Sequence, residues 1–433
     1  MKAYKPQCSI PPHINGFLSS PDIRSTMDIV WTCAATLLLC TWSILHLNIP
    51  IEVTSNGSAS QTLRRNLYLT ARKLWWMFIT FMAPEIILGK ALSDLVSARR
   101  TTKEMAEYVR EDGVEWTLTH TFLANMGGFA IEFKKDEDEE VPVEEINTTK
   151  ANTFPASEKP TVAVAPDSND NKVPKDEEAE TSGSVLQEFY HSRMSKSRFK
   201  YGLNIFKQWS MGTPRWHLHT RNSRLAEEAA LSSRSLDVRV HKPTSYWCNI
   251  MALRGNIWIL DARQLLTARS RGLISSLPNL SEEDISDRSK SDALVKAITA
   301  FNVLWLVIQL IVRAAQGLAV TQLEIVTLSF ALCSIATYML LLSKPQDIGT
   351  RIHIPASTTR HPTIDDFKAL AYLGPETFWY VRAETWVPDA SSHYLDVSNI
   401  KWLRFLAHHS SLQVSIIATL IISVPFGAVH LIA

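Results

Sequence analysis

The chain has 433 residues and a formal net charge of +1, from 44 Lys and Arg against 43 Asp and Glu. This balance excludes a uniformly basic nucleic-acid-binding protein and an acidic solvating tail as descriptions of the whole chain. Only 15 residues are glycine, which disfavours turn-rich β-barrels and glycine-looped nucleotide folds. Long apolar stretches and a charged middle predict an all-α, multi-span helical membrane protein with a cytosolic helical region and a disordered linker.

An N-terminal tail over residues 1–26 precedes the first predicted membrane region, residues 27–98. The segment 27–47 reaches the ~20 residues that a helix needs to cross a bilayer, and Ile29–Leu45 within it carries no charge. Its apolar run is longer than the core of a signal peptide, and no small-residue cleavage site follows it. We therefore expect a retained anchor, with a cleaved signal as the alternative.

A second apolar segment, residues 74–96, contains the pair Pro84-Glu85. Proline removes a helical hydrogen bond, and a carboxylate at membrane depth is costly unless it is protonated, paired or in a polar cavity. The segment is therefore a short, tilted or interfacial helix, or it continues past Lys90 and Asp94, which have i,i+4 spacing, and places Glu85 in mid-span. The sequence leaves both alternatives open.

The middle of the chain is polar. Residues 99–135 are predicted to form an amphipathic helical segment, in which Trp116–Ile131 lies on a membrane surface or packs on other helices. Residues 136–184 are predicted to be a disordered acidic linker, because their large apolar residues are too few to offset the entropy of ordering.

Residues 185–292 are predicted to form a basic, aromatic-containing helical region in the cytosol. Between residues 192 and 242 there are 11 Lys and Arg against three acids, with aromatic residues interleaved. Such a segment can lie on anionic lipid headgroups. A solvated helical face is the alternative, and the absence of a framing motif argues against a nucleic-acid partner.

Residues 293–343 are predicted to form a transmembrane helical hairpin from Ala293–Val312 and Ile325–Leu342. A soluble connecting region, 344–410, then leads to a C-terminal span, 411–433. The bilayer is thus the predicted partner. The chain is predicted to be a multi-pass protein located in an endomembrane or in the plasma membrane.

Lys and Arg residues near the ends of the spans predict that residues 99–292 are cytosolic. Asn56 then becomes a lumenal glycosylation acceptor, with the sequons at Asn147 and Asn279 as alternatives. Four basic residues disagree with this orientation, because they lie in the predicted lumenal loop: Arg64, Arg65, Arg72 and Lys73.

Catalytic residues stay unknown, and four intramembrane polar groups are weak candidates: Glu85, Gln309, Arg313 and Glu324. The last three lie near the turn of the hairpin, where Arg313 and Glu324 are expected either to form an ion pair or to leave Arg313 extending to the headgroups.

Motifs of soluble enzymes are absent. The sequence has no phosphate-loop, zincin, serine-hydrolase or dinucleotide motif, so no cofactor is expected. The pair His217 and His219 and the pair Asp365 and Asp366 are weak metal candidates, and no metal site is predicted. The five cysteines contain no C-x-x-C pair and indicate neither a disulfide framework nor a zinc ribbon.

Several stretches resemble a family of fungal multi-spanning integral membrane proteins of unknown function. They are STMDIVWTCAATLLLCTWSILHLNIP (25–50), RKLWWMFITFMAPEIILGKAL (72–92), WTLTHTFLANMGGFAIEF (116–133), GNIWILDARQLLTARSRGLI (255–274), 287–332 and KPQDI (344–348). The resemblance implies a membrane location and a fungal origin, and it offers no catalytic residues. Family members continue past a segment similar to PFGAVHLIA, where this chain stops, which suggests a shortened paralogue or an incomplete gene model.

These features predict a membrane-resident interaction, scaffold or sensor protein rather than an enzyme. The alternative is a membrane-embedded enzyme or transporter that acts on a lipophilic metabolite. It requires the four intramembrane polar groups to converge on a polar cavity.

Overall fold

The computed structural model describes residues 26–52, 59–134, 219–235, 244–289, 293–377 and 387–393, and scattered residues between 416 and 427. The predicted N-terminal tail, the disordered linker, most of the basic segment 192–242 and most of the C-terminal span therefore lie outside the described residues. The described chain is mostly helical, as predicted.

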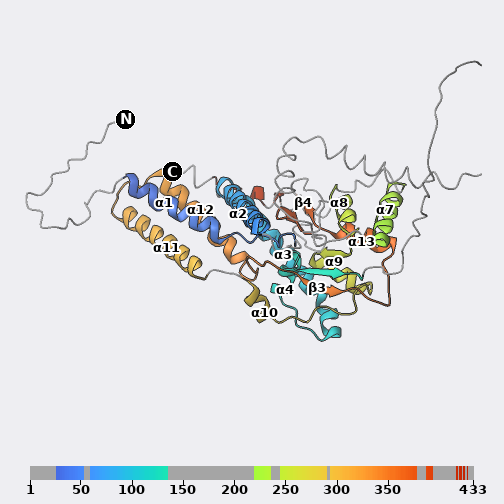
Figure 1. Ribbon diagram of the computed structural model, residues 1–433. Helices are drawn as coiled ribbons and strands as arrows, with labels where there is room; N and C mark the ends of the chain where they lie inside the picture. The colour runs from blue at the N-terminus through green and yellow to red at the C-terminus, as the bar shows by residue number, and fades with distance from the viewer. Residues whose placement is uncertain are drawn as a thin grey trace, which may run out of the picture.

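Three helices form an apolar bundle, on the left of Figure 1: α1 (Thr26–Ser43), α11 (Ala293–Ala315) and α12 (Gln322–Leu340). All three are long and apolar enough to cross a membrane. They pack around a small core that includes Cys40, Val303 and Phe330. Their outer faces expose large apolar side chains, among them Trp31, Leu38, Phe301, Leu304, Trp305, Ile308, Ile311, Leu332, Ile335 and Met339.

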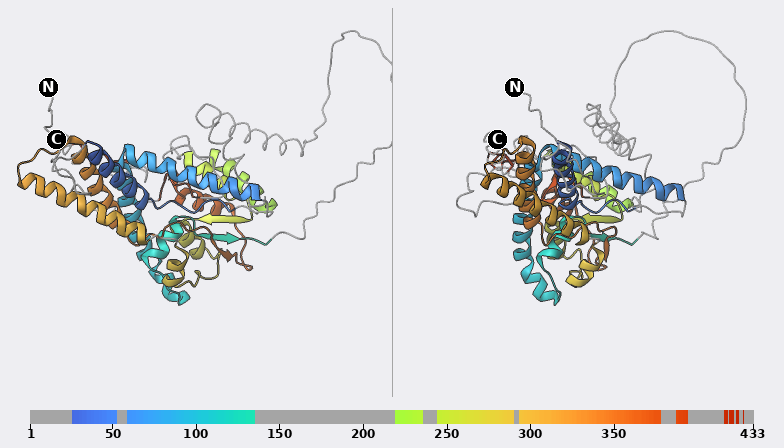
Figure 2. Two further views of the ribbon diagram at one scale, coloured as in Figure 1. Left: turned by 60° about the vertical axis from the view of Figure 1, so that its left-hand side comes forward. Right: turned by 90° about the vertical axis from the view of Figure 1, so that its left-hand side faces the viewer.

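Two further helices, α2 (Ala59–Met82) and α3 (Pro84–Asp112), are separated by a break at Ala83. Pro84 occupies the first position of α3, where its missing N–H leaves no hydrogen bond unmade. Helix α3 contacts α12 in the bundle and α4 and α9 beyond it. It therefore joins the bundle to the rest of the molecule. The left view of Figure 2 shows α2, in blue, running from the bundle across the rest of the molecule.

Beyond the bundle lies a three-stranded sheet in the order β2-β1-β3, which we call, with its surrounding helices, the sheet unit. Strand β1 (Phe129–Glu132) pairs antiparallel with β2 (Ile257–Leu260) and parallel with β3 (Ile352–Pro355). The all-α prediction is therefore wrong here. Strands of four buried residues have too few positions to show an alternating pattern. The prediction from sequence therefore assigned the residues of both β1 and β2 to helical regions.

Short helices cover the sheet. At its centre the ring of Trp258 on β2 contacts two other aromatic rings, with centroid distances of 4.5 Å to Phe133 and 5.0 Å to Phe367. The covering helices are α4 (Leu118–Asn125), α7 (Thr220–Ser235), α8 (Thr244–Ala252), α9 (Ala262–Ser270), α10 (Glu282–Arg288) and α13 (Ile364–Leu373). A two-stranded ribbon, β4 (Glu376–Thr377) with β5 (Ser391–Ser392), lies beside α3 and α8.

The segment after α1 enters the core of the sheet unit. Ile49 is fully buried there, and its N–H donates to the carbonyl of Met126 at 3.0 Å. Gln346, beyond α12, donates to the Ser43 carbonyl at the end of α1 at 2.9 Å, and its N–H donates to Ser289 Oγ, four residues before α11, at 3.0 Å. The carboxyl ends of α1 and α12 and the amino end of α11 therefore lie together beside the sheet unit. This arrangement differs from the predicted orientation, which placed the segment after α1 and residues 99–292 on opposite sides of a membrane.

Candidate functional site

Five charged residues gather where the bundle meets the sheet unit: Arg72, Lys90, Asp94, Lys344 and Asp389. We call them the junction cluster. Lys90 Nζ lies 3.0 and 2.9 Å from the two carboxylate oxygens of Asp94, one helical turn further along α3, and 2.9 Å from the carbonyl oxygen of Ser391. Lys344, just beyond α12, donates to Asp94 Oδ2 at 3.1 Å. Two lysines from different elements thus share one carboxylate.

Arg72 of α2 makes the second half of the junction cluster. Its guanidinium binds the Asp389 carboxylate and donates to the Asn48 carbonyl at 2.6 Å. The Asn48 N–H in turn donates to Asp389 Oδ1 at 2.8 Å, and its side-chain amide donates to the Pro388 carbonyl at 2.9 Å. These bonds tie α2, the segment after α1 and the loop before β5 into one unit.

Burial makes this cluster energetically important. The side chains of Lys344 and Asp94 are only 5% and 4% exposed. Burial lowers the pKa of Lys344 below the ordinary lysine value, and the attraction of Asp94 offsets part of this effect. Removing one member of a buried pair leaves an uncompensated charge, so the junction cluster holds its elements in one arrangement.

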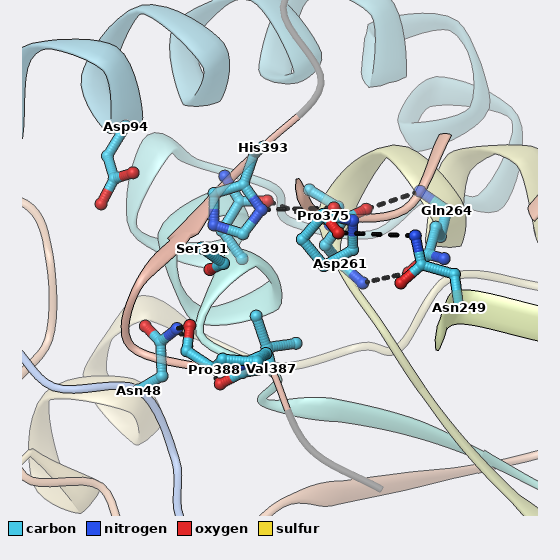
Figure 3. Close-up of polar contacts among 12 residues, drawn as sticks. Asn48, Asp94, Asn249, Asp261, Gln264, Pro375, Val387, Pro388, Ser391 and His393 are labelled. Carbon is cyan, nitrogen blue, oxygen red and sulfur yellow. Dashed lines mark hydrogen bonds and ion pairs between the residues drawn. The ribbon is translucent and has the colours of Figure 1, made fainter. Parts of the chain in front are cut away.

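A second buried contact joins β5 to the start of α9 (Figure 3). His393 Nδ1 lies 3.2 Å from Asp261 Oδ2, while Asp261 Oδ1 accepts the N–H of Gln264 at 2.9 Å and caps the helix. Ser391 lies two residues before His393, and within the described part of the chain its buried hydroxyl has no hydrogen-bond partner. Because Ser391 does not bond to His393, the nucleophile–base contact of a serine hydrolase is not formed.

A third polar group links the segment after α1 to the sheet. Glu52 accepts the Arg351 N–H at 2.8 Å and lies 3.3 Å from His353 Nε2 on β3. Burial opposes ionisation of Glu52, but the bonds from His353 and Arg351 outweigh it and lower the pKa of Glu52 to about 2. Arg351 itself donates to the carbonyls of Gly127 and Ile49 at 3.0 and 3.1 Å.

The four predicted site residues occupy separate places. Glu85 lies in the first turn of α3, a helix that packs on α12, and its Oε2 has no hydrogen-bond partner among the residues described. Glu324 is fully buried in the first turn of α12, where it accepts the Thr321 N–H at 2.9 Å and the Thr321 hydroxyl at 2.8 Å.

At the other side of the hairpin turn, Arg313 donates to the carbonyl of Ala319, and Gln309 lies one helical turn earlier on α11. The structure therefore gives Arg313 and Glu324 different partners instead of pairing them. Glu85 precedes Lys90, which lies with Asp94 and Lys344 at the carboxyl end of α12, by five residues or about 7 Å of helix. Glu324 lies at the other end of α12, 16 residues or about 24 Å before Leu340. Glu85 is thus at a different level from the hairpin turn, and the four groups do not converge.

The sequence showed only part of the junction cluster. The i,i+4 spacing of Lys90 and Asp94 is visible in the chain, whereas Lys344 and Asp389 are remote from α3 in sequence. Arg72 lay in a segment assigned to a lumenal loop. Only the fold brings the five residues together.

Metal and modification candidates are also placed. Across the described ranges, no three His, Cys, Asp or Glu side chains form a group that could hold a metal ion, and Asp366 is paired with Arg271 and Arg360 at 2.9 and 3.1 Å. His217, Asn56 and Asn147 lie outside the described residues. Asn279 is exposed in the loop before α10.

Comparison with known protein families identifies a match. The model of a family of unknown function (DUF8562) matches residues 3–152 and 262–372. These ranges include the bundle helices, the four predicted site residues and every member of the junction cluster except Asp389. Neither a curated protein nor a solved structure matches the chain.

Proposed function

The chain belongs to this family of unknown function, and we propose that it is a membrane-resident interaction, scaffold or sensor protein. In this proposal α1, α11 and α12 insert into a bilayer as a multi-pass anchor, and the sheet unit operates in water at its surface. The observation that carries the proposal is the apolar outer face of the bundle. Phe301 is 67% exposed and Trp305 is 51% exposed on α11, and a surface of this kind marks contact with lipid or another apolar partner.

The junction cluster supports the scaffold or sensor role. A flexible linker would leave the anchor and the sheet unit free to reorient, whereas here buried ion pairs and the continuous helix α3 join them. A displacement of α12 or α3 within the membrane would therefore reach the sheet unit through Lys344 and Asp94. Such coupling between a membrane anchor and a water-exposed unit fits a protein that holds a partner, or senses a change, at a membrane surface.

Unpartnered polar atoms favour the alternative, a membrane-embedded enzyme or transporter for a lipophilic metabolite. Glu85 Oε2 and Gln309 Oε1 are buried without hydrogen-bond partners within the described part of the chain. Their separation along the bundle weakens this alternative, because a shared polar site needs them to meet. Thiol labelling of Glu85→Cys and Gln309→Cys from water would support the alternative if both positions react.

Extraction of the full chain from membranes at alkaline pH tests the anchor. The wild-type protein is expected to remain with the lipid, because three apolar helices hold it there. Replacing Phe301 and Trp305 by Lys should weaken retention, whereas Lys at the exposed positions Glu282 and Glu283 of the sheet unit should not. Release of the wild-type protein into the soluble fraction would contradict the proposal.

The prediction that residues 192–242 bind anionic headgroups remains a further proposal. Within that range the structure describes residues 219–235, where α7 packs on α8 and α13. One of its acids, Glu227, pairs with Arg254 at 2.7 Å. Glycosylation and a fungal origin likewise remain predictions.

A further inference from the structure

We propose that α2 and α3 form a re-entrant hairpin that enters and leaves the bilayer on the same side. In this proposal the last turns of α2 from Leu74 and the first turns of α3 to Gly89 dip into one leaflet beside α12, with the break at Ala83 as the tip. The partner is the acyl-chain region of that leaflet. The inference rests on the proposed function, in which α1, α11 and α12 are inserted.

The first arm, in α2, passes beside the carboxyl ends of the bundle helices α1 and α12. Lys73 Nζ lies 2.9 Å from Asp347 Oδ2 and 4.0 Å from the centroid of the Trp42 ring. Trp42 is the penultimate residue of α1, and Asp347 follows the end of α12 at Leu340. Lys73 therefore lies at the boundary between the bundle and the sheet unit, where a charged group reaches water or headgroups.

The second arm crosses the same level. Lys90 and Asp94 of α3 meet Lys344, four residues beyond the last residue of α12. Both arms thus place charged residues beside the carboxyl ends of the bundle helices. The chain between them, Leu74–Gly89, has Glu85 as its single charged residue.

The tip lies partway along the bundle. From Pro84 at the start of α3 to Lys90 beside Lys344, the second arm has six residues of helix, or about 9 Å. From Lys73 to Met82 the first arm has a similar length, about 13 Å. Both distances are less than half of the ~30 Å hydrocarbon core, so the hairpin is too short to reach the opposite surface.

The outward face of the hairpin is apolar. Side chains on the opposite face, including Trp76, Thr80 and Ile87, are buried. Helix α3 packs on α12, which itself exposes Ile335 and Met339. The exposed large apolar residues of the hairpin and its exit are Leu74, Trp75, Phe78, Phe81, Met82, Ile86 and Leu92.

The break itself is compatible with a lipid environment. Irregular backbone at membrane depth is tolerated where its polar groups are satisfied. The Ala83 N–H donates to the Ile79 carbonyl at 2.9 Å, and the Ile86 N–H donates to the Ala83 carbonyl at 3.2 Å. Pro84 has no N–H to satisfy.

The test uses the full chain in sealed lipid vesicles and a membrane-impermeant maleimide, with Cys8→Ser and Cys248→Ser to lower the background. Leu67→Cys and Arg99→Cys, on the two water-side extensions of the arms, should react from the same side. Phe81→Cys should react roughly tenfold or more slowly than Leu67→Cys, because the reactive thiolate does not form among acyl chains. All three positions are exposed, so the substitutions leave the packing intact.

Phe301→Cys on α11 separates failure of this inference from failure of the proposed function. Protection of Phe301→Cys with rapid labelling of Phe81→Cys overturns the hairpin alone. Rapid labelling of both positions overturns the anchor as well. Reaction of Leu67→Cys and Arg99→Cys from opposite sides also overturns the hairpin, because the segment would then cross the membrane.

Discussion

Lys344 Nζ and Asp94 Oδ2 lie 3.1 Å apart where the end of α12 meets α3, and both side chains are almost fully buried. Lys90 shares the same carboxylate, at 2.9 Å from Asp94 Oδ2. One acid therefore balances two lysines that come from the bundle end and from α3. Because one carboxylate serves two lysines, loss of Asp94 should lower the stability more than loss of either lysine.

Asp94→Asn should destabilise the protein more than Lys344→Met does. The amide leaves the buried Lys344 and the half-buried Lys90 without the carboxylate that they share, whereas loss of Lys344 leaves Asp94 paired with Lys90. A broken buried pair costs about 3–5 kcal/mol, and we expect Asp94→Asn to reach that range in thermal or denaturant unfolding in detergent. Glu227→Gln is the matched control, because the Glu227–Arg254 pair is partly exposed and should contribute about 0–1 kcal/mol. Equal effects of Asp94→Asn and Glu227→Gln would contradict the assignment.

Arg313→Leu and Glu324→Leu should have additive effects on stability. The short turn predicts an ion pair between these residues, but the structure joins Arg313 to the Ala319 carbonyl and Glu324 to Thr321. Glu324→Leu removes a capping contact in a fully buried position, so it should be the more harmful change. A double-mutant cycle measures the coupling, and a coupling energy above about 1 kcal/mol would restore the ion pair.

Sequence reasoning found the apolar helices because their signal is long and local. The helices Thr26–Ser43, Ala293–Ala315 and Gln322–Leu340 each present an almost unbroken apolar run, and the proline at position 84 correctly marked a break between two helices. The strands were missed because each has at most four residues. The junction cluster was missed because Asp94 and Lys344 are 250 positions apart, and no local pattern reports a contact at that separation.

Glu52 should stabilise the fold at neutral pH and lose this effect in acid. Its pKa is lowered to about 2 in the folded protein, against an ordinary value of 4.5. A lowered carboxyl pKa contributes stability above the ordinary value, and the contribution is lost as the pH falls towards the folded value. Glu52→Gln should therefore lower the melting temperature at pH 7, and the difference from wild type should shrink between about pH 4.5 and pH 2.

The matched control for this change is Glu283→Gln on the exposed surface of α10. It removes the same charge without removing the contacts to His353 and Arg351. The melting temperature of each variant, followed by circular dichroism across the pH range, gives the comparison. A constant difference between Glu52→Gln and wild type at every pH would show that the carboxylate charge is not the source of stability.

Glycosylation provides a test of the side of the membrane on which the sheet unit lies. Ile49 is part of the core of the sheet unit, and Glu52 bonds to β3. Asn56 follows Glu52 by four residues, which span at most about 14 Å, too little to cross a bilayer. If the bundle is inserted as proposed, this chain length keeps Asn56 on the same side of the membrane as the sheet unit and Asn279, in contrast to the predicted opposite sides.

Expression in microsomes followed by external protease should give one of two linked results. If Asn56 carries a glycan, shown by the effect of Asn56→Gln on an endoglycosidase shift, then the sheet unit should be protected from protease. If Asn56 is unmodified because it faces the cytosol, then the sheet unit should be accessible to protease. A glycan at Asn56 together with protease cleavage of the sheet unit would place Asn56 and the sheet unit on different sides of the membrane. The contact between Ile49 and Met126 would then be absent from the membrane-bound protein.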